Sequence, residues 1–278
     1  MHPSERRVAV VGDDRAAALR QALGGLSYRS VERSAADAVV AVGDEVVRDV
    51  LVDAPDAPVI PVGSRQFAVD VDTAERRMGA LLDAALRGDG DRPDDGDFLA
   101  VDRPAADRSA VDRPAVDRPA ADVRRATHPI LAVDAGDGEA RRAAFDVALV
   151  TAEPARISEF AIDFAGGTDE SFRADGVVVA TPLGSGGYAN AAGGPIVEPG
   201  GGLSVAPISP FSTRADARVA VGRLSLSVER EAESVALVVD GDERGAVDPH
   251  RSVAIEATGS VAVVTLAGAS RERRSETL

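Results

Sequence analysis

The stretch DGVVVATPLGSGGY occupies residues 175–188 and is followed by AGGPIVEP at residues 192–199 and APISP at residues 206–210. It reads as an acidic residue, a buried strand, a glycine-rich turn and a short helix. Such a turn lets backbone N–H groups approach an anionic or polar ligand, and the N-terminus of the following helix adds its dipole. The alternative is a tight turn that only packs, which a short glycine pattern taken alone favours.

The first part of the chain alternates apolar runs with helical patterns. Its expected strands lie at residues 7–11, 37–42 and 59–62, and its expected helices at residues 15–23, 45–51 and 73–86. Buried strands separated by helices are typical of a parallel sheet. We therefore predict an α/β domain over residues 1–87, with a Rossmann-like doubly wound sheet.

The composition changes to Asp, Arg, Pro and Ala in the middle of the chain. Residues 101–125 read as five pentapeptides, which are VDRPA, ADRSA, VDRPA, VDRPA and ADVRR. A period of five matches neither a helix nor a strand, and prolines interrupt any helix. Because little of this segment can be buried, we predict a disordered linker over residues 88–125.

Short apolar runs with glycine and Asp/Pro turns follow the linker. They predict strands at residues 145–152, 156–164, 176–181, 218–228, 235–240, 252–256 and 261–266, and one helix near residues 188–193. This pattern indicates an all-β, sandwich-like domain over residues 126–268, with a tail at residues 269–278.

The charge of the chain is strongly acidic. Its formal net charge is -15, and all 31 basic residues are arginine, since lysine does not occur. Nucleic-acid binders need a basic face, so the composition argues against a nucleic-acid partner. It resembles the proteins of salt-accumulating halophiles, in which concentrated salt screens the self-repulsion of the chain.

Cysteine is absent, so disulfides, thiolate metal cages and a cysteine nucleophile are excluded, and an intracellular protein is the default. The three histidines, His2, His128 and His250, lie far apart, so we expect no histidine metal site. The first residues lack the long apolar core of a signal peptide, and no apolar run approaches the roughly 20 residues that cross a bilayer. We expect a cytoplasmic protein without a membrane partner.

The order and spacing of the elements in residues 175–210 resemble the NAD kinase family. Its members carry DG-x-x-x-x-TPTGSTAY, then AGGP-x-x-x-P and a PI-x-P element, and VDGD at residues 239–242 resembles the family's late DGQ turn. The resemblance implies an NAD kinase-like fold and phosphorylation of the adenosine ribose 2′-hydroxyl of NAD to give NADP. It also implies ATP or polyphosphate as donor, Mg²⁺, and a homodimer or homotetramer.

The segment AVGDEV at residues 41–46 resembles the family's GGDGT motif. The resemblance implies that Asp44 is the general base for the 2′-hydroxyl, and that Gly43 and Glu45 belong to the loop around the phosphate donor. A carboxylate within hydrogen-bond reach of the attacking hydroxyl suits phosphoryl transfer. The alternative is that Asp44 only caps the next helix.

The resemblance implies further contacts to the dinucleotide. Asp146 stands in the family's Asn-Glu or Asn-Asp pair, where Phe145 replaces the asparagine and offers apolar surface for stacking. An aspartate without a ligand is the alternative. The remaining implied contacts are Arg173, Asp175, Leu183, Gly186, Gly187, Tyr188, Ala189, Asn190, Ala191 and Ser209.

The departures from the family cluster on the donor side, although Gly186 also stands where the family has threonine and Gly187 where it has alanine. Val42 and Glu45 replace glycines, and PVGSRQF at residues 61–67 stands where the family has GVN-x-G-x-x-GF. Retention of Asp44 favours an active kinase, whereas the replacements favour a catalytically silent, NAD(P)-binding relative. A lipid kinase of the wider fold group fits less well, because its shared element is the donor motif.

Overall fold

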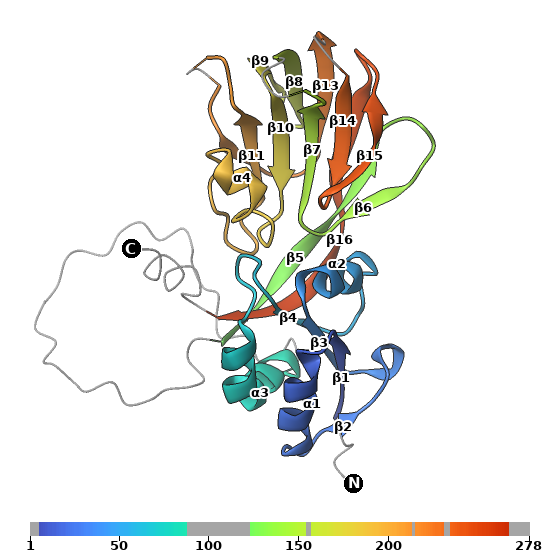
Figure 1. The fold of residues 1–278 in the computed structure, drawn as a ribbon, viewed down its shortest axis with the longest axis vertical. Helices are drawn as coiled ribbons and strands as arrows, with labels where there is room; N and C mark the ends of the chain where they lie inside the picture. The colour runs from blue at the N-terminus through green and yellow to red at the C-terminus, as the bar shows by residue number, and fades with distance from the viewer. Residues whose placement is uncertain (1–5, 88–122, 154–156, 213–214, 231–233, 267–278) are drawn as a thin grey trace, which may run out of the picture.

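The computed structural model describes residues 6–87, 123–153, 157–212, 215–230 and 234–266 (Figure 1). Most of the predicted linker and all of the predicted tail at residues 269–278 lie outside the described residues. The last three residues of the predicted linker, 123–125, are described and begin a strand.

The first part of the chain is an α/β unit. Helices α1 (Ala16–Gly24) and α3 (Val71–Ala85) pack on one face of its parallel sheet, and α2 (Asp44–Val52) packs on the other. Because side chains alternate along a strand, Val40 faces α1 and α3, whereas Val39 faces α2. The prediction of a doubly wound sheet is confirmed. Its strands, in sheet order, are β2 (Arg29–Ser30), β1 (Arg7–Gly12), β3 (Ala38–Val42) and β4 (Val59–Val62).

The second part is a β-sandwich, as predicted. One layer is a six-stranded antiparallel sheet in the order β12 (Arg218–Ala220), β11 (Leu203–Ile208), β10 (Gly176–Ala180), β7 (Asp146–Thr151), β14 (Val235–Val239) and β15 (Asp242–Val247). The other layer contains β13 (Leu224–Arg230), β8 (Ser158–Phe164) and β9 (Thr168–Ala174). Phe160, Leu149, Val177 and Leu226 are buried between the layers.

Two long strands join the sandwich to the α/β unit. β5 (Val123–Asp134) and β16 (Ser252–Leu266) pair along their length, and β16 also pairs with β13 and, in parallel, with β4. A single ten-stranded sheet therefore runs through both parts of the molecule (Figure 1). The sequence predicts two strands where β16 is continuous, because a bulge between Ala257 and Gly259 interrupts the apolar pattern.

Other strand predictions need correction. Residues 218–228 form two strands rather than one, since Gly222 has a φ of +84° and turns the chain from β12 in one sheet to β13 in the other. Six strands of the described residues were not predicted from the sequence: β2, β5, β6 (Arg141–Ala143), β9, β11 and the exposed edge strand β15. β9 and β15 are rich in charged residues, so their apolar pattern is weak.

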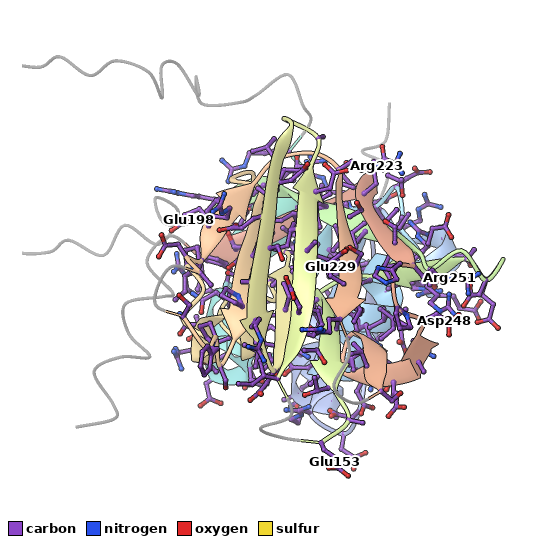
Figure 2. The ribbon with its side chains drawn as sticks, turned by 90° about the horizontal axis from the view of Figure 1, so that it is seen from above. Glu153, Glu198, Arg223, Glu229, Asp248 and Arg251 are labelled. Atoms are coloured by element: carbon purple, nitrogen blue, oxygen red, sulfur yellow. The ribbon has the colours of Figure 1, made fainter. Side chains whose placement is uncertain are left out.

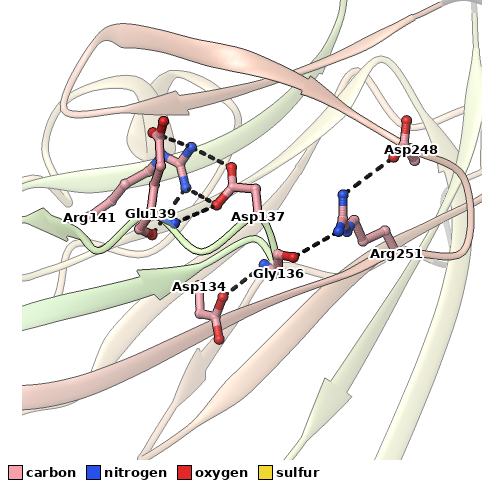
Figure 3. Close-up of polar contacts among 7 residues, drawn as sticks. All are labelled: Asp134, Gly136, Asp137, Glu139, Arg141, Asp248 and Arg251. Atoms are coloured by element: carbon pink, nitrogen blue, oxygen red, sulfur yellow. Dashed lines mark hydrogen bonds and ion pairs between the residues drawn. The ribbon is translucent and has the colours of Figure 1, made fainter.

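The turn between β5 and β6 is held by charged contacts (Figure 3). Arg141 donates to Asp137 and, over 2.9 Å, to Glu139. Arg251, just before β16, donates to the carbonyl oxygen of Gly136 over 2.7 Å. The Arg141 hydrogen bonds hold the pKa of Asp137 well below its ordinary value. These contacts tie the hairpin to the start of the long central strand.

Charged side chains also cover the outer surface of the sandwich. Seen from above, Glu153, Glu198, Arg223 and Asp248 lie around the rim of the molecule (Figure 2). Among the described residues, no helix is long and apolar enough to cross a membrane.

Candidate functional site

Three segments from different parts of the chain meet at the junction of the two units. They are the start of α2 at Asp44, the loop of residues 63–67 after β4, and the glycine turn of residues 184–187 after β10. The loop after β4 rises toward the glycine turn (Figure 1). A Cβ atom added at Gly186 would overlap the Gln66 side chain, so the two loops are in close contact.

Asp44 is the first residue of α2, and its carboxylate is oriented by the loop after β4. Its Oδ1 accepts a hydrogen bond from the Ser64 backbone N–H over 2.8 Å, and its Oδ2 accepts one from the Ser64 hydroxyl. Gly43 occupies the N-cap position, so Asp44 is the first residue inside the helix and its carboxylate is bound by Ser64 instead. The capping alternative for Asp44 is therefore wrong, and the carboxylate faces the junction, where its side chain is 31% exposed.

The backbone accommodates Val42, one of the residues that replace the family's glycines on the donor side. Val42 completes β3 and is fully buried, while the positive φ of this turn, +99°, falls on Gly43. The β-branched residue therefore does not have to adopt a left-handed conformation. Glu45 is exposed next to Asp44 and adds a second carboxylate at this helix end.

The glycine turn is closely packed. A Cβ atom at Gly184 would overlap the carbonyl oxygen of Phe145, and Thr181 donates its hydroxyl hydrogen to the carbonyl of Ala144 over 2.7 Å. The N–H groups of Gly184, Ser185 and Gly187 already donate within the turn. The following helix, α4 (Tyr188–Ala191), has only four residues, two fewer than predicted. The turn is therefore shaped by packing, and the expected helix dipole is not part of the site.

Asp240 holds the chain just before β7. Its buried carboxylate accepts hydrogen bonds from the backbone N–H groups of Ala144, Phe145 and Asp146 at 2.8, 2.7 and 2.9 Å. Burial raises the pKa of Asp240, and the three N–H donors and Arg48 oppose this shift. One carboxylate thus fixes the position of three consecutive residues.

His128 supports the same segment from β5. It is fully buried, and its Nε2 lies 2.8 Å from the carbonyl oxygen of Ala144, which fixes Nε2 as the protonated nitrogen. Burial lowers the pKa of His128 to about 4. This neutral histidine is buried within a strand and supports the segment before β7.

Asp146 begins β7 and is only 7% exposed. Burial, and secondarily the charge of Asp240, raises the pKa of Asp146 to about 6, while the charge of Arg65 lowers it. The carboxyl group therefore changes its protonation state near pH 6, and above that pH it is mainly ionised and accepts hydrogen bonds from a ligand.

Arg65 crosses the junction. Its guanidinium carbon lies 4.1 Å from the centre of the Phe145 ring, and its Nε lies 3.9 Å from Asp44 Oδ2. A Cβ atom at Gly187 would lie 3.6 Å from Arg65 Nη1. Phe145 is 1% exposed beneath the guanidinium, so its ring does not offer a stacking surface to a ligand, in contrast to the expectation from the sequence.

The remaining polar residues of the predicted site lie on the sandwich side. The pKa of Tyr188 is raised mainly by burial, and then by the negative charges of Asp175 and Asp146. The Tyr188 hydroxyl therefore lies within electrostatic range of both carboxylates. Ser209, with a φ of +47°, follows β11, and Phe211 beyond it donates its backbone N–H to the Arg173 carbonyl. This strand end thus lies beside Asp175.

Not every predicted residue can present its side chain to a ligand. Leu183 and Ala189 are fully buried and belong to apolar cores. Asn190 donates to the Gly194 carbonyl over 3.1 Å, and Ala191 is exposed at the end of α4. The exposed Gly186 and Gly187 offer backbone only.

Four residues that help to form the junction were not predicted as site residues: Ser64, Arg65, Gln66 and Asp240. The first three lie in PVGSRQF, and its departure from the family pattern was the available signal. Asp240 lies in the VDGD turn that carries part of the resemblance. Among the described residues, no group of three or more His, Asp or Glu side chains could hold a metal ion.

Part of the chain is similar in sequence to known proteins. Residues 146–265 match the family described as ATP-NAD kinase C-terminal domain. The NAD kinase of Methanospirillum hungatei is 34% identical over 122 residues, 43% of this chain and 45% of that protein. The NAD kinase of Methanopyrus kandleri is 36% identical over 136 residues, 48% of this chain and 49% of that protein. The matched stretch spans about half the length of these curated relatives.

Two solved structures are similar over nearly the whole chain. The NAD kinase from Archaeoglobus fulgidus in complex with ATP has a TM-score of 0.60 and 20% identity, covering 97% of this chain and 96% of that one. Yeast NADH kinase complexed with NADH has a TM-score of 0.66 and 14% identity, covering 100% of this chain and 88% of that one. Residues 146–265 are therefore similar to the ATP-NAD kinase C-terminal domain, and the chain has the fold of these two solved structures.

Proposed function

We propose that this protein is an NAD kinase, which phosphorylates the adenosine ribose 2′-hydroxyl of NAD to give NADP. The observation that carries the proposal is the meeting of Asp44, from the α/β unit, with Asp146 and the glycine turn, from the sandwich. Arg65 lies near both of these elements. A ligand at this junction contacts a carboxylate suited to activate a hydroxyl and a strand end suited to bind a ribose.

In the proposed reaction, the 2′-oxygen attacks the terminal phosphorus of the donor. A bond forms between the 2′-oxygen and phosphorus, the bond from phosphorus to the bridging oxygen breaks, and ADP leaves when ATP is the donor. The proton of the 2′-hydroxyl passes to Asp44. The Ser64 hydrogen bonds orient this carboxylate, and phosphoryl transfer needs little more than such positioning and charge stabilisation.

The donor is ATP or polyphosphate, bound near Gly43 and Glu45. In kinase sites Mg²⁺ is bound mainly by phosphate oxygens and water, with one or two carboxylates, and does not need a cage of side chains. Asp44 and Glu45 are the carboxylates at this end of α2, and they fit such a limited role. When bound, the metal ion neutralises phosphate charge.

NAD binds on the sandwich side. Asp146 and Asp175 accept hydrogen bonds from ribose or amide groups, and Tyr188, which is 43% exposed, offers its ring as a stacking surface. Arg173, Asn190, Ala191 and Ser209 lie at the edge of this surface. Leu183 and Ala189 support it from the core.

A catalytically silent NAD(P)-binding protein is the second candidate. It is favoured by Glu45, which places negative charge at the presumed donor site, and by Phe145, whose buried ring cannot replace the hydrogen bonds of an asparagine. Both candidates predict binding of the dinucleotide, and only the first predicts turnover.

The test is NADP formation from NAD, Mg²⁺ and either ATP or polyphosphate, followed with an NADP-specific dehydrogenase. The assay is run in multimolar KCl, because the acidic, lysine-free composition supports a halophilic, cytoplasmic protein that folds best in salt. Turnover supports the kinase. Saturable NAD binding by calorimetry without turnover supports the silent protein, and absence of both contradicts both candidates.

A further inference from the structure

We propose that Arg65 contacts the phosphoryl group during its transfer to the 2′-hydroxyl, and that it also contacts the 2′-phosphate of the product. This inference rests on the proposed function, because it places the transferred group between Asp44 and Asp146. It adds a residue from the loop after β4, the part of the chain that departs most from the family pattern.

The position of Arg65 is the first argument. Its Nε lies 3.9 Å from the carboxylate proposed as the base, and its Nη1 approaches the backbone of Gly187 in the glycine turn. The guanidinium therefore spans the space between the group that takes the proton and the turn proposed to face the dinucleotide. A phosphoryl group moving between donor and ribose has to pass this space.

The second argument is that the Phe145 ring supports the Arg65 guanidinium. The guanidinium lies over the buried Phe145 ring at 4.1 Å, and Phe145 itself is fixed by the Asp240 carboxylate through its backbone N–H. The cation-π contact holds the guanidinium over the ring, and a guanidinium carries its N–H donors along its edge rather than on its face. Arginine in this arrangement is suited to a bidentate contact with phosphate oxygens.

The charge of the site is the third argument. Asp44, Glu45 and Asp146 place three carboxylates around the junction, and they repel a phosphate-bearing ligand. Arg15 lies near Gly43 but is paired with Asp13 over 2.7 Å. Arg65 is a cation that lies between Asp44 and the glycine turn, and arginines that stabilise transferring phosphoryl groups in other enzymes have large effects on rate.

Arg65→Gln tests the proposal, with Arg218→Gln as the matched control. Arg218 makes the same two kinds of contact on the far edge of the sandwich: its guanidinium lies 5.4 Å from the Phe164 ring, and it pairs with Glu170 at 2.7 Å. We expect Arg65→Gln to lower kcat about 100-fold, the size of effect of one lost transition-state donor. We also expect its affinity for NADP to fall about 10-fold more than its affinity for NAD.

Arg65→Lys is the second variant, since it keeps the charge and loses the planar fork. We expect it to fall between wild type and Arg65→Gln, with a thermal unfolding midpoint close to that of wild type. Arg218→Gln is expected to leave kcat and the ratio of NAD to NADP affinity unchanged.

The outcomes separate this inference from the proposed function. Wild-type turnover with Arg65→Gln within threefold of wild type overturns the inference and leaves the kinase standing. Equal loss of NAD and NADP affinity in Arg65→Gln also overturns it. If wild type binds both dinucleotides without turnover, a selective loss of NADP affinity still supports the contact to the 2′-phosphate. If wild type binds neither dinucleotide, the proposed function and the inference fall together.

Discussion

The glycine turn of residues 184–187 and the loop of residues 63–67 face the same junction but are held in different ways. The turn is fixed by close packing, since Gly184 leaves no room for a Cβ atom beside the Phe145 carbonyl. The loop is fixed by charge and polar contacts, through Ser64 and Arg65 to Asp44. The packed side lies in the part that matches the ATP-NAD kinase C-terminal domain, whereas the loop lies outside that match.

Packing and charge restrict substitutions in these two segments in different ways. A site in contact with backbone tolerates few substitutions, because any added atom overlaps a neighbour that cannot move. A loop held by side-chain charges can exchange residues while a carboxylate such as Asp44 keeps its position. We infer that the dinucleotide side sets the shape of the site, and that the loop sets its charge.

The largest effect on stability is expected from Asp240→Ala, which tests whether the packed side depends on one carboxylate. The substitution leaves three buried N–H groups without an acceptor, at about 1–3 kcal/mol each. We expect a loss of at least about 3 kcal/mol in the free energy of unfolding, measured with denaturant. Asp242→Ala, whose side chain is 51% exposed, is the control and is expected to cost less than about 1 kcal/mol. Equal losses in the two variants would contradict the proposed role of Asp240.

The next effect concerns pH. The pKa of Asp146 is raised from 3.8 to about 6, so folding disfavours its charged form. Asp146 does not destabilise the fold below about pH 4, where its carboxyl is neutral in both the folded and the unfolded protein. As the pH rises from 4 through 6, the free energy of unfolding falls by about 3 kcal/mol, because the unfolded protein releases this proton more readily. Asp146→Asn removes this titration, and we expect its stability relative to wild type to increase between pH 4 and pH 7. A difference that stays constant with pH would show that Asp146 does not titrate in this range.

A smaller effect is expected from Gly184→Ala, which sharpens the contrast between packing and charge. The added methyl group overlaps the Phe145 carbonyl, and overpacking typically costs about 1–3 kcal/mol. Gly79→Ala in α3 is the matched control, because a Cβ atom there meets nothing within 4 Å. We expect this control to be stabilised by about 0.5–1 kcal/mol through higher helix propensity. Equal stability of the two variants, measured by thermal unfolding, would contradict the packing account.

Much of the fold is predictable from the sequence because it follows from local patterns. The strands before and after α2 are continuous apolar runs, and the glycine turn follows directly from residues 181–188. The two long strands β5 and β16 are not predictable in this way, since their partners lie far apart in the sequence and a bulge at Ala257 and Gly259 breaks the pattern. The sequence therefore predicts two units but not the sheet that joins them.

The site is predictable only in part, for a similar reason. Some site residues stand in motifs, so the spacing of each motif is enough to identify them: Asp44, Asp146 and the glycines of the turn. Arg65 and Asp240 act through contacts that bring distant segments together, and no local pattern indicates which carboxylate accepts the three N–H groups before β7. Burial of the Phe145 ring likewise depends on the guanidinium that covers it.

The most direct test of the account is the split between kcat and NAD affinity in Asp44→Asn, measured in concentrated KCl with NAD, ATP and Mg²⁺. In the proposed function Asp44 takes the proton of the 2′-hydroxyl, and NAD binds on the sandwich side. We therefore expect kcat to fall by about 10²- to 10⁴-fold, while the Kd for NAD from calorimetry stays within about threefold of wild type. Turnover at the wild-type rate, or loss of NAD binding together with turnover, would contradict the account.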